Sequence, residues 1–288
     1  MAETGWIGLV LLSAAFHPLR DLMLKGVGRP VSSYVGVSVV WAVIAALQAY
    51  WTSQSLAPPA EAWQFVLVSA VGLSFYYYGT LAALRRGNLS VYYPIVRSSP
   101  LAIVVFSLIF LSGHYSALNL LGIGLILLGG LMIQKSPGQL LDDPKAFGLA
   151  VLAMLGSAAY SLSDAAAMQI TTAAPFLFYV YVLTTVMLVT AQAIEERQPR
   201  AVLSRVWSGW RQAPVRIVVA GVVSYLSYLL ILYAFSIGAE AANVTAVRQA
   251  SIPVSVVFAA VLLREPRFIH RIGWASLIAA GILCIALL

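Results

Sequence analysis

The sequence predicts an all-α integral membrane protein with ten transmembrane helices, built from two inverted five-helix repeats. Three observations lead to this fold class: the composition, a series of ten apolar stretches, and an internal duplication. Of the 288 residues, 61% are hydrophobic and 9% are charged, whereas soluble domains are about 25% charged. With a mean hydropathy of +0.91, the chain has too little polar surface for water, and we expect it to lie in a lipid bilayer.

Ten apolar stretches follow one another along the chain, and each is close to the roughly 20 residues that a spanning helix needs. They cover residues 5–24, 32–50, 63–84, 89–111, 117–133, 146–166, 175–194, 216–237, 241–263 and 272–288. The first repeat is expected over residues 1–134, a cytoplasmic linker over 135–145 and the second, inverted repeat over 146–288. Because residues 1–4 include Glu3 and no Lys or Arg, the first stretch is expected to be a retained helix and not a secretory signal.

The basic residues are confined to alternate connections between these stretches. Fourteen of the 17 Lys and Arg residues lie in the odd-numbered connections, and the even-numbered connections and the tails hold none. Because basic loops stay in the cytoplasm, both termini are predicted on the non-cytoplasmic side of the inner (plasma) membrane. This placement accounts for the net charge of +7 without a nucleic-acid partner. Trp207 and Trp210, in the longest basic connection, are expected to anchor it at the interface.

The two halves of the chain repeat each other at matched polar and glycine positions. Constant shifts superpose these pairs: Tyr77 on Tyr228, Arg97 on Arg248, Gly122 on Gly273, Gly130 on Gly281 and Asp21 on Asp164. A unit with an odd number of helices must enter the membrane in the opposite orientation when it is duplicated. This is the inverted-repeat plan of many secondary transporters, which bind substrate near the midplane and work by alternating access.

The ends of the two halves carry the most specific motifs. Pro100-Leu-Ala-Ile-Val-Val-Phe precedes Gly122 and Gly130, and Pro253-Val-Ser-Val-Val-Phe precedes Leu263-Arg264-Glu265. Over almost the whole chain the pattern resembles the EamA-type branch of the drug/metabolite transporter superfamily. The first half departs from it, with Ser112-Gly113-His114 in place of the Leu-Arg-Glu ending. Within the branch, the length and the aromatic content of 11% look most like YddG-type exporters of aromatic amino acids. The resemblance implies export of small amphipathic metabolites, chiefly aromatic or other neutral amino acids.

Arg97 and Arg248 are the strongest candidates for substrate binding. Each lies roughly 12 Å into its span at 1.5 Å per residue, where a charge costs at least about 2.5 kcal/mol and must face protein, a cavity or a ligand. Two guanidinium groups near the midplane are suited to a substrate carboxylate. Alternatively, they pair with buried acids such as Asp21 or Asp164, or with helix carbonyls, and only hold the bundle together.

Aromatic and titratable residues near the two arginines complete the predicted site. The expected substrate-binding residues, besides the arginines, are Tyr77, Tyr78, Tyr160, Tyr228 and His17. Buried tyrosines need a hydroxyl partner, which a wet cavity provides, although packing and interfacial belts also use aromatic residues. Asp21 and Asp164 are predicted to gate the two ends or to take up a proton, with local pairing near the interface as the alternative for Asp21.

Four prolines are expected to kink helices around the cavity, because proline removes a backbone hydrogen bond and frees carbonyls. They are Pro18, Pro94, Pro100 and Pro253. The glycines of the fifth and tenth stretches are expected to form small faces for close helix packing.

The sequence holds no nucleotide-binding loop and no metal-ligand motif. We therefore expect no catalytic residue, metal or cofactor, and a protein that is not an enzyme. The expected partners are a small-molecule substrate and the lipid bilayer, with the chain acting as a monomer or homodimer. Two alternatives remain: an organic-anion or phosphate-ester exchanger that uses Arg97 and Arg248, and a membrane enzyme or scaffold that transports nothing.

Overall fold

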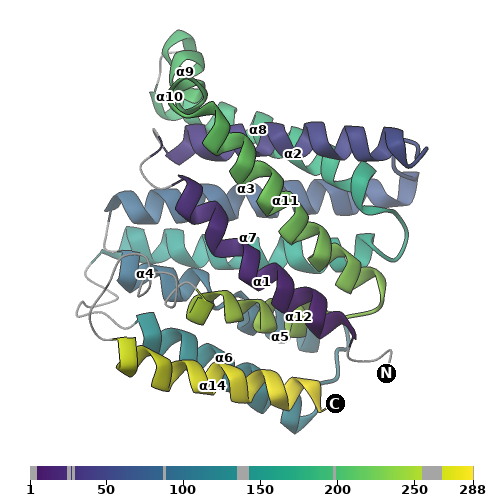
Figure 1. Ribbon diagram of the computed structural model, residues 1–288, viewed down its shortest axis with the longest axis vertical. Coiled ribbons are helices and arrows are strands. Elements are labelled where there is room, and N and C mark those ends of the chain that lie inside the picture. Colours follow the sequence, from purple (N-terminus) through teal and green to yellow (C-terminus); the bar gives the residue numbers. More distant parts are fainter. Residues whose placement is uncertain are drawn as a thin grey trace.

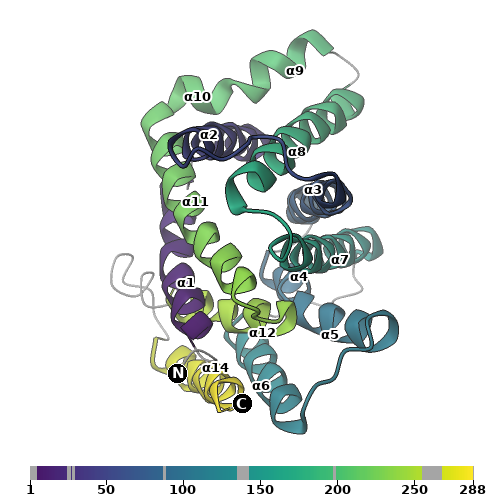
Figure 2. The same cartoon turned by 90° about the vertical axis from the view of Figure 1, so that its right-hand side faces the viewer.

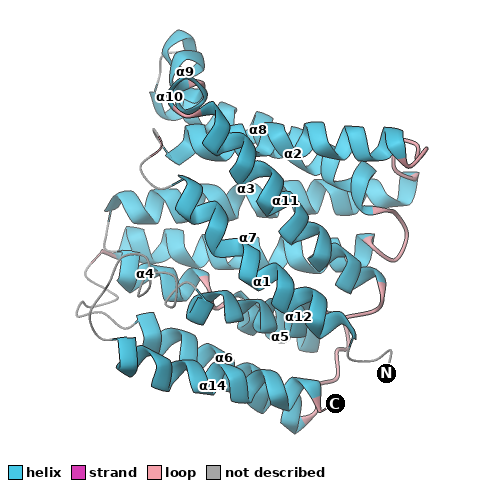
Figure 3. Cartoon of the chain, viewed as in Figure 1, coloured by secondary structure: helices cyan, strands magenta, loops and turns pink. Residues whose placement is uncertain are grey.

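The computed structural model describes residues 5–24, 27, 30–86, 89–134, 143–196, 199–254 and 268–287. Figure 3 shows helices joined by loops, and no strand occurs within these ranges. The elements are α1 (Gly5–Leu24), α2 (Pro30–Trp51), η1 (Ala60–Ala62), α3 (Trp63–Arg86), α4 (Leu89–Val96), α5 (Ser99–Phe110), α6 (Ala117–Gln134), α7 (Pro144–Ala167), α8 (Ala173–Glu196), α9 (Pro199–Val206), α10 (Ser208–Gln212), α11 (Pro214–Ser236), α12 (Ala241–Val247), η2 (Arg248–Ala250) and α14 (Phe268–Ala286).

The chain is a multi-pass membrane protein by the length and composition of its helices. In the described ranges, six helical segments are long and apolar enough to cross a membrane: Val31–Trp51, Ala60–Ala83, Tyr92–Phe110, Pro144–Ala167, Ala173–Ile194 and Pro214–Ser236. Three shorter apolar segments are Gly5–His17, Ala117–Ile133 and Gly273–Ala286. Helices occupy parts of all ten expected stretches, but the ninth runs into residues 255–267, which lie outside the described residues. The number of spans therefore stays a prediction.

The fourth and ninth stretches are broken where single helices were expected. The fourth divides into α4 and α5 around residues 97 and 98, and the ninth changes from α12 to the 3₁₀ turn η2 at Arg248. Pro94 lies inside α4 and Pro100 lies at the start of α5, so two backbone N–H donors are missing around the first break. Pro253 follows the second break. By contrast, α1 continues as one helix through Pro18, whose side chain lies outside the described residues.

The connection between residues 195 and 215 was expected to be a loop, but it forms the short helices α9 and α10. One buried side chain of α2 fastens them to the bundle. Ser32 Oγ donates to the carbonyl of Val206 at 2.5 Å and accepts from the amide of Gly209 at 2.7 Å. The junction of α9 and α10 has backbone groups without intrahelical partners, as at any helix end, and these two bonds satisfy them. Because Ser32 and Gly209 are far apart in the sequence, the pattern of apolar residues did not predict this contact.

Four pairs of helices build the bundle: α1 with α11, α2 with α8, α3 with α7, and α6 with α14. In Figures 1 and 2 the members of each pair lie side by side. Glycines allow the closest approaches, as expected for α6 and α14. A Cβ added to Gly122 would lie 2.8 Å from the carbonyl oxygen of Gly281, and one added to Gly281 would lie 2.5 Å from that of Gly122. Gly72 and Gly156 meet in the same reciprocal way between α3 and α7.

The surface of the bundle suits a lipid environment. Large apolar side chains lie exposed on most long helices, among them Leu67, Leu108, Leu121, Val186 and Val218. The Gly5 end of α1 and the Ala286 end of α14 lie at the same edge of the helix layer, on the right in Figure 1. The ends that carry Arg86 in α3 and Lys145 in α7 lie at the opposite edge. This arrangement separates the termini from the described basic helix ends.

Candidate functional site

A central cavity lies between α1, α2, α3, α7, α8, α11 and η2. Its lining combines aromatic rings, hydroxyls and two arginines. The lining residues are His17, Arg20, Trp41, Leu73, Tyr76, Tyr77, Tyr160, Tyr181, Ser224, Ser227, Tyr228 and Arg248. Of the residues expected at a substrate site, His17, Tyr77, Tyr160, Tyr228 and Arg248 lie together here.

Arg248 lies at the break of the ninth stretch and reaches into the cavity. Its guanidinium carbon lies 5.4 Å from the centre of the Tyr228 ring, and Nη1 donates a long hydrogen bond of 3.5 Å to the Tyr160 hydroxyl. Within the described structure, its buried Nε has no hydrogen-bond acceptor. Arg248 forms no ion pair with a described carboxylate, so its contacts are with neutral aromatic groups. A cation held over an aromatic ring in this way keeps donors available for an anionic ligand.

Arg97 lies at the matching break between α4 and α5, beside the cavity and not in its lining. Its Nη2 donates to the Tyr93 hydroxyl at 2.8 Å, its guanidinium lies 5.0 Å from that ring, and Nη1 donates to Ser251 at 3.4 Å. The side-chain amide nitrogen Nε2 of Gln249 donates to the backbone carbonyl oxygen of Arg97 at 2.9 Å. The side chains of Arg97 and Gln249 therefore bond the two breaks to each other.

Asp164 lies near the end of α7 and joins three helices. Its carboxylate accepts hydrogen bonds from Ser69 of α3, at 2.5 Å, and from the hydroxyl of Tyr228 of α11. The residue is 2% exposed. In the described part of the chain its partners are these hydroxyls, and no arginine forms an ion pair with it. Tyr228 consequently contacts both the Asp164 carboxylate, through its hydroxyl, and Arg248, through its ring.

Trp41 forms part of the cavity wall that the sequence reasoning missed. Its ring lies 4.2 Å from that of Tyr181 and 5.5 Å from that of Tyr228, and its Nε1 donates to Ser224 at 2.9 Å. A signal was present in the sequence: Trp41 lies in the middle of an apolar stretch, away from the interface where tryptophan is common. Buried tryptophan needs a hydrogen-bond acceptor, and this one finds it on α11.

The cavity encloses about 30 Å³, whereas pockets for drug-sized ligands are roughly 300–1,000 Å³. In this conformation the aromatic side chains occupy the space, which suits water and not a metabolite. Rings from α3, α7 and α11 lie close together across it, with Tyr76 and Tyr160 5.8 Å apart and Tyr160 and Tyr228 6.4 Å apart. A metabolite would enter only if these helices moved relative to one another.

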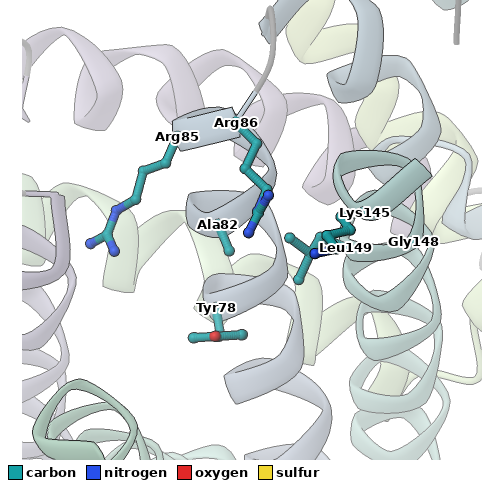
Figure 4. A pocket seen from close by; sticks show the side chains of 7 residues that line it. All are labelled: Tyr78, Ala82, Arg85, Arg86, Lys145, Gly148 and Leu149. Atoms are coloured by element: carbon teal, nitrogen blue, oxygen red, sulfur yellow. The ribbon is translucent and has the colours of Figure 1, made fainter. Parts of the chain in front are cut away.

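The remaining expected site residues lie elsewhere or outside the description. Tyr78 does not line the central cavity; it lines a separate crevice at the basic end of α3 (Figure 4). The side chain of Asp21 lies outside the described residues. The described residues contain no group of three or more His, Cys, Asp or Glu side chains that could hold a metal ion.

The family match lies in the half of the chain that contains α1 to α6, and a structural match covers nearly the whole chain. Residues 4–134 match the EamA-like transporter family. A curated protein of Sinorhizobium sp., "Uncharacterized transporter in cobO 3'region", is 29% identical to this chain over 136 residues, which are 45% of this chain and 96% of that protein. A solved structure described as "Crystal structure of protein" is 15% identical, covers 99% of this chain and 98% of its own, and superposes with a TM-score of 0.75. At this identity the likeness shows the fold.

The EamA-like half supplies α1, α2 and α3 to the cavity, and the other half supplies α7, α8, α11 and η2. Both halves therefore contribute to one site. Chemically, the site offers a guanidinium group, aromatic faces and hydroxyls, a combination that binds a carboxylate attached to an apolar or aromatic group.

Proposed function

We propose that this protein is a secondary transporter that exports small amphipathic metabolites bearing a carboxylate, chiefly aromatic or other neutral amino acids, by alternating access. The observation that carries the proposal is the central cavity, where Arg248 lies over the Tyr228 ring at a break in a membrane helix. Irregular backbone at membrane depth occurs where it lines a cavity or a substrate site. The match of residues 4–134 to a transporter family supports the same class of function.

The helix pairs are consistent with two inverted repeats. The sequence shifts suggest that α1 corresponds to α7 and α3 to α11. A two-fold axis between the repeats would then relate the pair α1–α11 to the pair α7–α3. Both pairs exist, and α2–α8 and α6–α14 are each carried onto themselves. The reciprocal contact of Gly122 with Gly281 is of the kind that a two-fold relation produces. The matching positions of Arg97 and Arg248 at helix breaks add to this support.

The hydrogen bonds of Asp164 suggest how one end of the cavity is closed. Ser69, Asp164 and Tyr228 join α3, α7 and α11 near the ends of these helices that face the termini, and Ser163 adds a bond of 2.7 Å to the carbonyl of Phe65. In the topology given by the basic residues, this is the non-cytoplasmic side of the inner membrane. We propose that the Asp164 cluster is the outer gate and that Asp21, near the other end of α1, serves the inner gate.

Amino acids fit the cavity better than phosphate esters do. The described lining holds two arginines, Arg20 and Arg248, and no lysine, together with six aromatic side chains. Phosphate carries up to two charges and draws on basic residues as point charges, whereas the aromatic faces here favour an apolar or aromatic side chain beside one carboxylate. The organic-anion or phosphate-ester exchanger therefore remains the second candidate, with Arg97 and Arg248 as its binding residues.

Uptake of radiolabelled amino acids into inverted membrane vesicles tests the proposal. Phenylalanine, tyrosine, tryptophan and leucine should accumulate above vesicles that lack the protein. Arg248→Gln and Arg97→Gln should each lower this flux at least tenfold at equal amounts of inserted protein. The matched control is Arg211→Gln, which removes the same charge from the exposed surface of α10.

Absence of flux for every amino acid, together with flux for a phosphate ester, would refute the substrate assignment. Equal loss of flux and of inserted protein in the Arg248 variant would show that this residue only holds the bundle together.

A further inference from the structure

An open crevice lies between the basic end of α3 and the first turns of α7 (Figure 4). It measures about 650 Å³ and is lined by Tyr78, Ala82, Arg85, Arg86, Lys145, Gly148 and Leu149. Figure 4 shows the two arginines leaving the end of α3 in different directions, with Arg86 on the side of Lys145. Its volume lies within the roughly 300–1,000 Å³ of small-molecule sites.

The crevice faces away from the central cavity. At 100° per residue, Tyr78, Ala82 and Arg85 share one face of α3. The α3 residues that line the central cavity, Leu73, Tyr76 and Tyr77, lie on the other side of the helix. A ligand would therefore reach the crevice without passing through the central cavity.

The charge of the crevice comes from side chains of two helices. Its lining includes three basic side chains and no acidic one among the described residues. The helix N-terminus of α7 adds little, because Asp143 already accepts from the amides of Lys145 and Ala146, at 2.9 and 3.1 Å. Two guanidinium groups and one ammonium group around an open volume are suited to a phosphate group, which accepts from several donors at once.

An exposed apolar seam continues from the crevice along α3 and α7. Phe75 is 45% exposed and Leu155 is 52% exposed. A Cβ added to Gly156 would lie 2.9 Å from the Cβ of Phe75, so Phe75 lies beside α7. Leu155 follows Gly148 of the crevice lining by seven residues, so these two residues share one face of α7. Phe75 precedes Arg85 by ten residues, or about 15 Å along the helix. The basic groups and the apolar seam are thus arranged like the headgroup and the acyl chain of a phospholipid.

We propose that this crevice binds the phosphate headgroup of an anionic phospholipid, whose acyl chain lies along the Phe75–Leu155 seam. Basic pockets between transmembrane helices are suited to anionic headgroups at the membrane surface. Arg86 and Lys145 provide the charge, and the missing side chain at Gly148 leaves the space. The inference stands apart from the transport proposal, because it concerns a separate surface and is tested by binding.

Native mass spectrometry of the purified protein in mild detergent tests this assignment, with phosphatidylglycerol, phosphatidylcholine and inorganic phosphate as probes. The wild-type chain should bind one phosphatidylglycerol in preference to phosphatidylcholine. Arg86→Gln with Lys145→Gln should weaken that binding by about fivefold for each charge removed, or about 25-fold together. Arg211→Gln, on exposed α10, is the control for each single charge removed and should change binding little.

A second variant blocks the crevice without changing its charge. A Cβ added to Gly148 would have no heavy atom within 4 Å, so Gly148→Phe can be accommodated by the fold while it occupies the crevice, and it should weaken phosphatidylglycerol binding at least fivefold. Gly124→Phe is its control, since Gly124 in α6 is equally open and lies on another helix.

Three outcomes would overturn the proposal. They are equal affinity for both lipids, full binding by the Gly148 variant, and displacement of phosphatidylglycerol by inorganic phosphate at similar concentration. Displacement by inorganic phosphate would show that the crevice binds a soluble phosphate and not a lipid. Loss of amino acid flux with intact lipid preference would refute only the transport proposal.

Discussion

The contact between α3 and α7 gives the sharpest test of the structure, because a single methyl group should disrupt it. Gly156 lies in the buried face of α7, against α3. A Cβ at this position would lie 2.5 Å from the carbonyl oxygen of Gly72, 2.8 Å from the amide nitrogen of Tyr76 and 2.9 Å from the Cβ of Phe75. Two of these neighbours are backbone atoms, which cannot rotate away. Gly156→Ala therefore requires the helices to separate.

The size of the effect follows from two opposing terms. Alanine favours a helix over glycine by up to about 1 kcal/mol, and overpacking a close contact costs typically 1–3 kcal/mol. Gly148→Ala in the same helix gains the helix propensity of alanine without the overpacking cost, since its Cβ would meet no heavy atom within 4 Å. The difference between the two variants isolates the clash, and we expect Gly156→Ala to be less stable than Gly148→Ala by about 1–3 kcal/mol.

Unfolding of the purified variants in the same detergent, followed by near-ultraviolet circular dichroism, measures this difference. The tyrosines at this contact, Tyr76 and Tyr160, make the signal sensitive to separation of α3 and α7. Equal stability of the two variants would refute the close packing described here, and with it the positions of these two rings in the cavity wall.

Three further predictions concern other parts of the chain. Ser32→Ala should leave the buried amide of Gly209 without its acceptor, at a cost of about 1–3 kcal/mol, and faster hydrogen exchange confined to α9 and α10 would be the expected readout. Tyr228→Phe should remove a hydroxyl donor from the Asp164 carboxylate and lower the unfolding free energy by about 1–3 kcal/mol; Tyr50→Phe, at a residue that is 78% exposed, is the control, and equal stability of the two variants would contradict the gate geometry. Partial burial raises the pKa of the Glu240 carboxyl above its usual value, so the folded chain holds this proton more tightly than the unfolded chain, and the associated stability falls as pH rises above about 4. Glu240→Gln should flatten this part of the stability profile, and an unchanged slope just above about pH 4 would show that another group is responsible.

The helices were largely predictable from the sequence, because length and hydropathy are local properties. Residues 5–24 were expected as one helix and form α1 with the same bounds. The break in the fourth stretch has a local cause too. Pro94 and Pro100 were expected to kink the fourth stretch, and the chain breaks between them. The helices α9 and α10 were missed because the bonds that hold them come from Ser32, far away in the sequence.

The composition of the cavity could be predicted only in part. Arg248 was identified because a charge within an apolar stretch is expensive and must have a partner. Trp41 was missed, although its place in the middle of an apolar stretch was a signal; the acceptor of its Nε1, Ser224, lies on a distant helix and is known only from the structure. Tyr78 was grouped with Tyr77 although the two line different sides of α3.

The sequence by itself determined that this protein lies in a lipid bilayer, where most of its helices lie along the chain, and which residues are too polar to face lipid. Only the tertiary structure decided which side of each helix faces the cavity and which hydroxyls surround Asp164. The reason is physical. In water, a polar face and an apolar face distinguish the outside of a helix from the inside. In a bilayer, lipid and protein interior are both apolar, so helices such as α3 carry apolar residues on every side and their orientation depends on packing against their neighbours.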